Sequence, residues 1–327
     1  MKKASLLLIS LLLVGCTLDY SSTIEQYSLV ESSESETEVE ISSVSSVSSS
    51  TVSSSSKTSS SSSSSTTSSS SFIETSTPTL TGYYASANGK TGQALKTALK
   101  DIIKNMDSVS YGSLYGSSGW MSKADKKANG NVWDVYSDVP NGTPPYEYSF
   151  SNTCGNYSKE GDCWNREHMI PQSVFSEKSP MVSDIFHLYP TDGKVNGMRS
   201  NFPFGEVNSA TFTSLNGSKL GSAITTFGYS GTVFEPIDAY KGDIARVYFY
   251  FVTRYQEVMP TFKDYAMFVK TDIGLSTWAQ KLLLKWHLQD PVSPKEIARN
   301  NYIYDNIQEN RNPFVDYPAL ATLIWSA

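Results

Sequence analysis

The chain has few histidines, few cysteines and no broad excess of positive charge. Only 3 of its 327 residues are His and 3 are Cys. Residues 81–327 carry 23 Lys and Arg against 24 Asp and Glu, so this part lacks the broad basic face of a tight nucleic-acid binder. A polyanion that binds here must therefore be held by a local basic patch or by a bound cation.

Beyond the N-terminus, no stretch is apolar enough to cross a membrane. The N-terminus itself, MKKASLLLISLLLVGC, places two Lys before a short apolar run and a small residue before Cys16, as in a secretory signal peptide. Its last four residues, LVGC, are similar to the lipobox of bacterial lipoproteins. That resemblance implies a signal peptide over 1–16 and a lipid on Cys16; an ordinary cleaved signal with a chance Cys is the alternative.

Residues 17–80 are rich in Ser and Thr, with a dense run of Ser from residue 42 to residue 71. Such a segment buries too little to offset the entropy that ordering would cost. We therefore expect a disordered tether over 17–80. The rest of the chain, 81–327, shows no internal repeat and no second linker, so we expect it to form one folded domain.

Two cysteines remain for this domain. Cys154 and Cys163 flank GNYSKEGD, and an exported pair at such short spacing favours a disulfide. A metal site completed by a His is the alternative, but no second Cys pair or close His pair supports it.

The domain carries several helical patterns and few short strands. Apolar residues at helical spacing predict helices over 91–106, 242–255 and 276–288. The SPKE sequence has the spacing of a capping box and predicts a further helix from residue 294 to about 308. Residues 131–138 have the pattern of a strand. The predicted fold class is therefore α+β, as one helix-rich domain.

Two neighbouring segments carry polar side chains suited to chemistry. The first, CWNREHMIP, is interpreted as a strand that ends at Glu167 and His168. The second is DIFHLYPTDGKVNGMRSNFPFGEV. There, residues 190–192 predict the start of a helix, with Thr191 or Asp192 as its cap.

If that helix continues, Asn196 and Arg199 lie three residues apart on one face and offer an amide oxygen and a guanidinium. Together with a Glu and a His they suit phosphodiester hydrolysis, because a neutral imidazole can take a proton from water near neutral pH. Oxygen ligands favour Mg²⁺, Mn²⁺ or Ca²⁺ over Zn²⁺. Since no Asp/Glu cluster for two metals is evident, one divalent cation is the simpler interpretation.

Three motifs, in order, resemble those of the endonuclease I family, which comprises bacterial secreted or periplasmic nucleases of the ββα-metal (His-Me finger) group. The first is NREH followed by Pro171. The second is D.FHLYPTDG.VN..RSN.PFGEV over 184–207, and the third is QENRNPFVDYP over 308–318. The similarity runs from about Tyr83 to the C-terminus, and it implies a ββα-metal motif within a catalytic domain at 81–327.

The resemblance also implies roles for single residues. His168 would be the general base, with Glu167 and Asn196 as ligands of one divalent cation, Mg²⁺ first and Mn²⁺ or Ca²⁺ as alternatives. The phosphate-binding Arg of the family has no secure match. Helix geometry favours Arg199 and the third motif favours Arg311, so both are candidate catalytic residues.

We therefore expect a metal-dependent, largely sequence-nonspecific endonuclease that hydrolyses DNA, RNA or both and leaves 5′-phosphate ends. It would act as a monomer outside the cytoplasm, held at the cell membrane by its lipid anchor. A non-catalytic tethered binding lipoprotein and a phosphodiesterase for small substrates are the alternatives. The remaining histidines, His187 and His287, are expected to be structural, with orientation of the site or phosphate binding as the alternatives for His187.

Overall fold

The computed structural model describes residues 77–326, so Cys16 and the Ser/Thr-rich stretch through residue 76 lie outside the described residues. Within the described part, no helix combines the length and the apolar character needed to cross a membrane. Helices surround two small antiparallel sheets, which confirms the α+β prediction.

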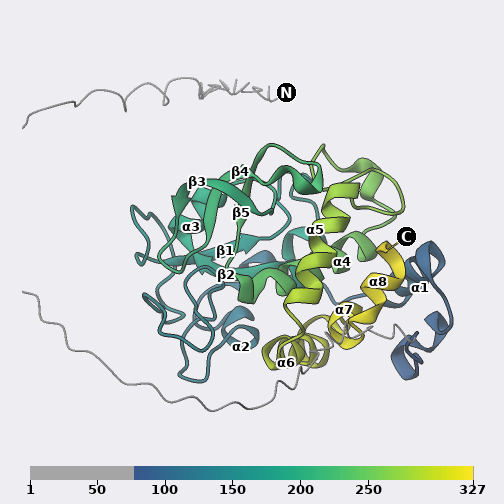
Figure 1. The fold of residues 1–327 in the computed structure, drawn as a ribbon. Coiled ribbons are helices and arrows are strands. Elements are labelled where there is room, and N and C mark those ends of the chain that lie inside the picture. The colour runs from purple at the N-terminus through teal and green to yellow at the C-terminus, as the bar shows by residue number, and fades with distance from the viewer. Residues whose placement is uncertain (1–76, 327) are drawn as a thin grey trace, which may run out of the picture. The chain divides into compact units, whose positions relative to one another are not determined.

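A two-stranded hairpin and the helix after it form one structural unit. β1 (Trp164–His168) pairs antiparallel with β2 (Leu188–Asp192), and α3 (Gly193–Arg199) follows β2 without a loop (Figure 1). The helix starts there because the Asp192 carboxylate accepts a hydrogen bond from the Val195 N–H at 2.8 Å and caps it. This β–β–α order agrees with the predicted ββα motif.

A second sheet follows the unit, with its strands in sequence order and antiparallel. Its strands are β3 (Val207–Thr213), β4 (Lys219–Ala223) and β5 (Thr232–Glu235). The short helices before α4 are η1 (Gly82–Ala87), η2 (Tyr111–Leu114), α2 (Met121–Ala124), η3 (Met181–Ser183), η4 (Ile185–His187), η5 (Thr225–Phe227) and η6 (Asp238–Tyr240). Of these, η1 packs against α1.

The helical half of the domain packs around α4 (Lys241–Arg254), of which every residue is buried. α5 (Thr277–Gln289) lies against α4, and α1 (Gly92–Ile103) contacts both α4 and α8 (Ala319–Trp325). Figure 1 shows the early helix α1 beside the late helix α8, so the two ends of the described chain close the helical half. The remaining helices are η7 (Met259–Thr261), α6 (Pro294–Ile303), the π-helix η8 (Tyr304–Gln308) and α7 (Pro313–Asp316).

The predicted strand at 131–138 was wrong. Only Val132 makes an isolated bridge there, with Lys126, and the chain then turns. The turn forms because the buried Asp134 carboxylate accepts the Tyr136 N–H at 2.7 Å, so local hydrogen bonding competes with strand pairing.

Three helix predictions needed adjustment at their ends. The helix expected over 91–106 ends at Ile103, and the helix expected to reach about residue 308 is α-helical only to Ile303 and continues as the π-helix η8. Residues 190–192 belong to β2 rather than to a helix start, and of the two candidate caps only Asp192 caps α3.

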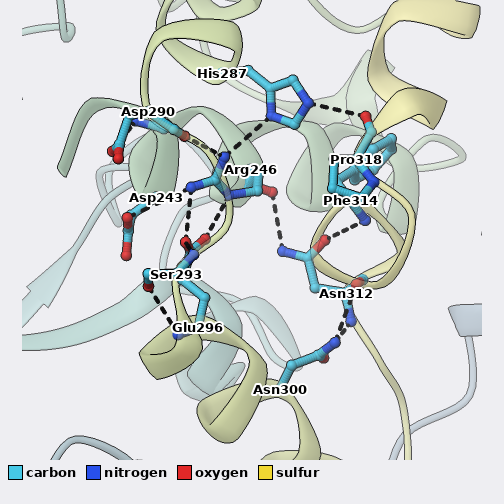
Figure 2. Close-up of polar contacts among 11 residues, drawn as sticks. Asp243, Arg246, His287, Asp290, Ser293, Glu296, Asn300, Asn312, Phe314 and Pro318 are labelled. Carbon is cyan, nitrogen blue, oxygen red and sulfur yellow. Dashed lines mark hydrogen bonds and ion pairs between the residues drawn. The ribbon is translucent and has the colours of Figure 1, made fainter. Parts of the chain in front are cut away.

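A buried polar cluster joins α4, α5 and α6 (Figure 2). The Arg246 guanidinium donates to the Glu296 carboxylate through Nε at 2.5 Å and Nη2 at 2.8 Å, and its Nη1 lies 3.3 Å from His287 Nδ1. His287 in turn donates from Nε2 to the Pro318 carbonyl at 2.9 Å. The predicted capping box between Ser293 and Glu296 is present, and His287 is buried in the core as expected.

The disulfide between Cys154 and Cys163 is present, as the short spacing predicted. The loop that it closes packs on α3, where Tyr157 covers two glycines one helical turn apart. A Cβ at Gly193 would lie 2.5 Å from Cys154 Sγ, and one at Gly197 would collide with the Tyr157 hydroxyl. The glycines therefore allow the disulfide loop to press against the helix that carries Asn196 and Arg199.

Candidate active site

A surface cavity of about 400 Å³ opens where the end of β1 meets α3. Its walls come from β1, the segment after β1, α3 and the turn after α3: Arg166, Glu167, His168, Pro171, Gln172, Ser173, Asn196, Gly197, Arg199, Ser200 and Asn201. Four of the five site residues predicted from the sequence meet here, and Arg311 does not.

A backbone carbonyl of η3 holds the ring of His168. Nε2 lies 3.0 Å from the Val182 carbonyl oxygen, so this nitrogen carries the proton and Nδ1 is left as an acceptor. Burial, with the nearby His187 ring as the next cause, lowers the pKa of His168 to about 3. The imidazole is therefore neutral at neutral pH, with one nitrogen able to take a proton.

The Glu167 carboxylate is buried and held on one side. Oε1 accepts hydrogen bonds from the Tyr136 hydroxyl at 2.9 Å and from Arg199 Nη1 at 3.0 Å, while Oε2 makes no hydrogen bond to a described residue. Burial raises the pKa of this carboxyl, and the Arg199 charge and the Tyr136 bond oppose the rise. One carboxylate oxygen is thus fixed and the other is free for a ligand.

The Asn196 amide is fixed in the same way. Its Nδ2 donates to the Asn165 side-chain oxygen at 2.7 Å, which ties the nitrogen to β1 and leaves Oδ1 as a free acceptor. Asn165 and Glu167 are two residues apart on β1 and so share one face, which lies toward α3. The hairpin and the helix therefore present one carboxylate oxygen and one amide oxygen to the cavity.

These donors fit a divalent cation that prefers oxygen ligands, such as Mg²⁺. Glu167 Oε2 and Asn196 Oδ1 are both free of hydrogen bonds to described residues, and both side chains line the cavity. Among residues 77–326 there is no group of three or more His, Cys, Asp and Glu side chains that could hold a metal. A cation at this site would therefore keep most of its ligands as water or substrate oxygens.

The two arginines proposed from the sequence both have protein partners. Arg199 is 1% exposed, and its guanidinium donates to Glu167, to the His168 carbonyl at 2.9 Å and to the Met169 carbonyl at 2.7 Å. Arg311 pairs through Nε and Nη2 with the Asp316 carboxylate, at 2.7 Å each, outside the cavity. The structure thus brings Arg199 to the cavity wall as a buried brace and leaves Arg311 apart from it.

Arg166 is a cavity residue that the sequence interpretation missed. Its guanidinium lies 3.7 Å from the centre of the Tyr111 ring and 4.4 Å from that of Tyr115, and Nη1 donates to the Tyr111 carbonyl at 2.8 Å. No carboxylate of a described residue forms an ion pair with it. Strand alternation contained the signal, because Arg166 is two residues before His168 and so shares its face of β1.

The other histidine of the motif stands behind the site. His187 is fully buried, its Nε2 lies 2.6 Å from the Met181 carbonyl, and its ring centre is 5.4 Å from that of His168. Burial lowers the pKa of His187. It does not line the cavity, in keeping with the structural role expected from the sequence.

The first strand of the hairpin ends in Glu-His, and the helix after the second strand bears Asn, which is the ββα arrangement of a His-Me finger nuclease. Residues 91–319 match the family described as endonuclease I. The chain belongs to the endonuclease I family, whose members are hydrolases that cleave phosphodiester bonds within nucleic acids.

Individual relatives agree with this assignment. An extracellular ribonuclease of Bacillus amyloliquefaciens is 35% identical over 264 residues, which cover 78% of this chain and 83% of the relative. An extracellular ribonuclease of Bacillus subtilis (strain 168) is 35% identical over 247 residues, covering 74% and 78%. An Endonuclease-1 of Buchnera aphidicola subsp. Baizongia pistaciae (strain Bp) is 30% identical over 172 residues, covering 53% and 58%.

Proposed function

We propose that this nuclease is a metal-dependent, largely sequence-nonspecific endonuclease that hydrolyses DNA, RNA or both and leaves 5′-phosphate ends. The observation that carries the proposal is the composition of the cavity. It is lined by a neutral His168 with a free Nδ1, and by Glu167 and Asn196, each with one oxygen that has no hydrogen bond to a described residue.

In this mechanism His168 is the general base. The Val182 carbonyl holds the Nε2 proton and thereby turns Nδ1 toward a water molecule in the cavity. Nδ1 takes a proton from that water as the oxygen attacks the phosphorus in line with the leaving 3′ oxygen. A fixed neutral imidazole contributes both the acceptor and its orientation.

Glu167 and Asn196 would hold one divalent cation, Mg²⁺ first and Mn²⁺ or Ca²⁺ as alternatives. When bound, such a cation polarises a phosphoryl oxygen and stabilises charge on the leaving 3′ oxygen. Arg199 keeps Glu167 in place through the 3.0 Å bond to Oε1, so its effect on catalysis is indirect.

Arg166 is the better candidate for the phosphate contact. Tyr111 and Tyr115 hold its guanidinium at the cavity wall, and it has no carboxylate partner among residues 77–326. A planar guanidinium held in advance matches the paired oxygens of a phosphate. In this respect the structure favours Arg166 over the two arginines proposed from the sequence.

The substrate and the location follow from the relatives and from the N-terminus. Two relatives are named as extracellular ribonucleases, and others as periplasmic or extracellular deoxyribonucleases, which supports an extracytoplasmic enzyme that acts on nucleic acid. The proposed lipid on Cys16, the tether through residue 80 and a monomeric state remain expectations from the sequence.

The test compares the full chain with His168→Ala on supercoiled plasmid and on single-stranded RNA, first with Mg²⁺ and then with a chelator. We expect wild type to cleave polymer, the chelator to stop it, and His168→Ala to lose at least about a hundredfold in rate with an unchanged circular dichroism spectrum. An Arg311→Met variant provides the control and should stay active.

A small aryl phosphodiester completes the substrate panel. An enzyme that hydrolyses the aryl ester but neither polymer is a small-substrate phosphodiesterase. A wild-type protein that is inert on all three with Mg²⁺, Mn²⁺ and Ca²⁺ contradicts the proposal and favours a tethered binding protein.

A further inference from the structure

A second cavity, of about 520 Å³, lies beside the turn that orients His168. Its walls come from the end of α1, the segment before η3, and the end of α4 with the residues after it. The residues used below are Lys104, Lys178, Pro180, Met181, Arg254 and Val258. It shares no lining residue with the active-site cavity.

Arg254 is a buried cation with one unused donor. Its side chain is 6% exposed, and its Nε has no hydrogen-bond partner among the described residues. The nearest carboxylate oxygen, Asp184 Oδ2, is 3.9 Å away and already accepts the hydroxyls of Tyr250 at 2.9 Å and Tyr255 at 2.8 Å. The guanidinium carbon also lies 5.0 Å from the centre of the Tyr255 ring. A buried N–H donor without an acceptor is costly, so the free Nε points to an anionic ligand.

The rim of the cavity adds positive charge. Lys104 and Lys178 are exposed and line it. Lys104 also pairs with Asp101 at 3.1 Å, and the single acidic residue in the lining, Glu257, is paired with Lys100. A guanidinium with two nearby ammonium groups matches the oxygens of a phosphate.

The opposite wall is apolar. Pro180, the buried Met181 and Val258, which is 38% exposed, give a ribose or a base a surface to pack on. The volume lies within the ~300–1,000 Å³ of small-ligand sites. We propose that this cavity binds a nucleotide phosphate, with the Arg254 guanidinium as its buried ligand.

This inference depends on the proposed nuclease function only for the source of the nucleotide. Met181 lines the cavity, its carbonyl bonds His187, and the next carbonyl, that of Val182, bonds His168. A bound nucleotide therefore lies against the turn that orients the general base. Two sources share this chemistry: a backbone phosphate of the strand being cleaved, and a free 5′-mononucleotide.

Binding is tested by calorimetry on the full chain in EDTA, with 5′-AMP, inorganic phosphate and adenosine as the probes. Because Arg254 is buried and its replacement can unfold the protein, the test uses the exposed wall residue. Val258→Asp places a carboxylate in the cavity, and Val258→Asn is the matched neutral control.

We expect 5′-AMP and phosphate to bind, adenosine not to bind, and Val258→Asp to weaken 5′-AMP at least about tenfold by charge repulsion. Val258→Asn should change the affinity by less than about threefold, since it adds no charge. The same affinity in Val258→Asp and Val258→Asn overturns the proposal, as does the absence of binding at millimolar probe. Binding that is lost in Asn196→Ala but kept in Val258→Asp also overturns it, because the phosphate then occupies the active site.

Cleavage assays separate the two sources. If the cavity holds a backbone phosphate, Val258→Asp raises KM for a long oligonucleotide but not for a dinucleotide. If it holds a free mononucleotide, KM is unchanged for both, and 5′-AMP alters the rate of wild type but not of Val258→Asp. Binding is measured in EDTA, and it is repeated with His168→Ala. The test of this cavity therefore does not require an active nuclease.

Discussion

Replacement of Arg199 by Met tests whether this arginine braces the site or contacts the substrate. Arg199 and Glu167 have side-chain exposures of 1% and 3%, and their ion pair at 3.0 Å is accompanied by bonds to two backbone carbonyls. Removing the guanidinium leaves the carboxylate buried without its partner, which costs about 3–5 kcal/mol. For a domain of this size we expect a fall in Tm of about 6–20 °C.

A double-mutant cycle isolates the pair. Glu167→Gln removes the charge that Arg199 neutralises, so the double variant should be more stable than the sum of the two single changes predicts, by about 1–3 kcal/mol. Arg311→Met is the control, because its pair with Asp316 is partly exposed, with side-chain exposures of 18% and 16%, and contributes about 1 kcal/mol or less.

The assay is denaturant unfolding of the full chain followed by circular dichroism, with cleavage measured well below the midpoint. If Arg199→Met is no less stable than Arg311→Met but loses cleavage activity, the brace assignment is wrong and Arg199 contacts the substrate. Additive effects in the Arg199 and Glu167 cycle would likewise contradict a direct charge pair.

Three further outcomes follow from the same geometry. Asn165→Ala should weaken Mg²⁺ activation of cleavage about tenfold because the Asn196 amide loses its anchor, whereas Asn165→Asp keeps an acceptor and should not weaken it. Burial, with the Arg246 charge as the next cause, lowers the pKa of His287 to about 4. The unfolded state therefore takes up a proton first as pH falls, and stability is full above about pH 6.5 and is lost toward pH 4. The stability advantage of wild type over His287→Gln should shrink by about 3 kcal/mol between pH 7 and pH 4 in urea titrations. Binding of a long polymer to His168→Ala should fall less than about 50-fold between 50 and 200 mM salt, and a thousandfold loss would indicate six or more phosphate contacts.

Local signals in the sequence predicted the parts of the fold that local interactions determine. The capping box of α6 and the Asp192 cap of α3 form as expected because each cap satisfies N–H groups within its own first turn. The strand at 131–138 failed because periodicity alone does not register a buried carboxylate that turns the chain, as Asp134 does. The second oxygen of the Asp134 carboxylate has a partner far along the chain, because it accepts the Asp192 N–H at 2.9 Å.

Glu167, His168 and Asn196 could be proposed from the sequence because few side chains suit a general base or an oxygen ligand of a cation. Glu167, His168 and Asn196 come together through one hairpin and one helix within a short span of chain, so their contact is nearly a local property. Their orientation is not local. The Val182 carbonyl and the Tyr136 hydroxyl fix His168 and Glu167 from segments that carry no motif.

The arginines show where prediction from the sequence stops. Each carries the same charge and reach, so residue type and spacing could not separate a phosphate contact from a brace. The separation lies in the partners: Arg199 meets a buried carboxylate, Arg311 pairs with Asp316, and Arg166 lies against two tyrosine rings with no acid among its described neighbours. A guanidinium that is already paired with a protein carboxylate has fewer N–H donors to offer to a substrate phosphate. We therefore propose Arg166, two positions before the proposed general base His168, as the phosphate contact; it already stands within the first motif.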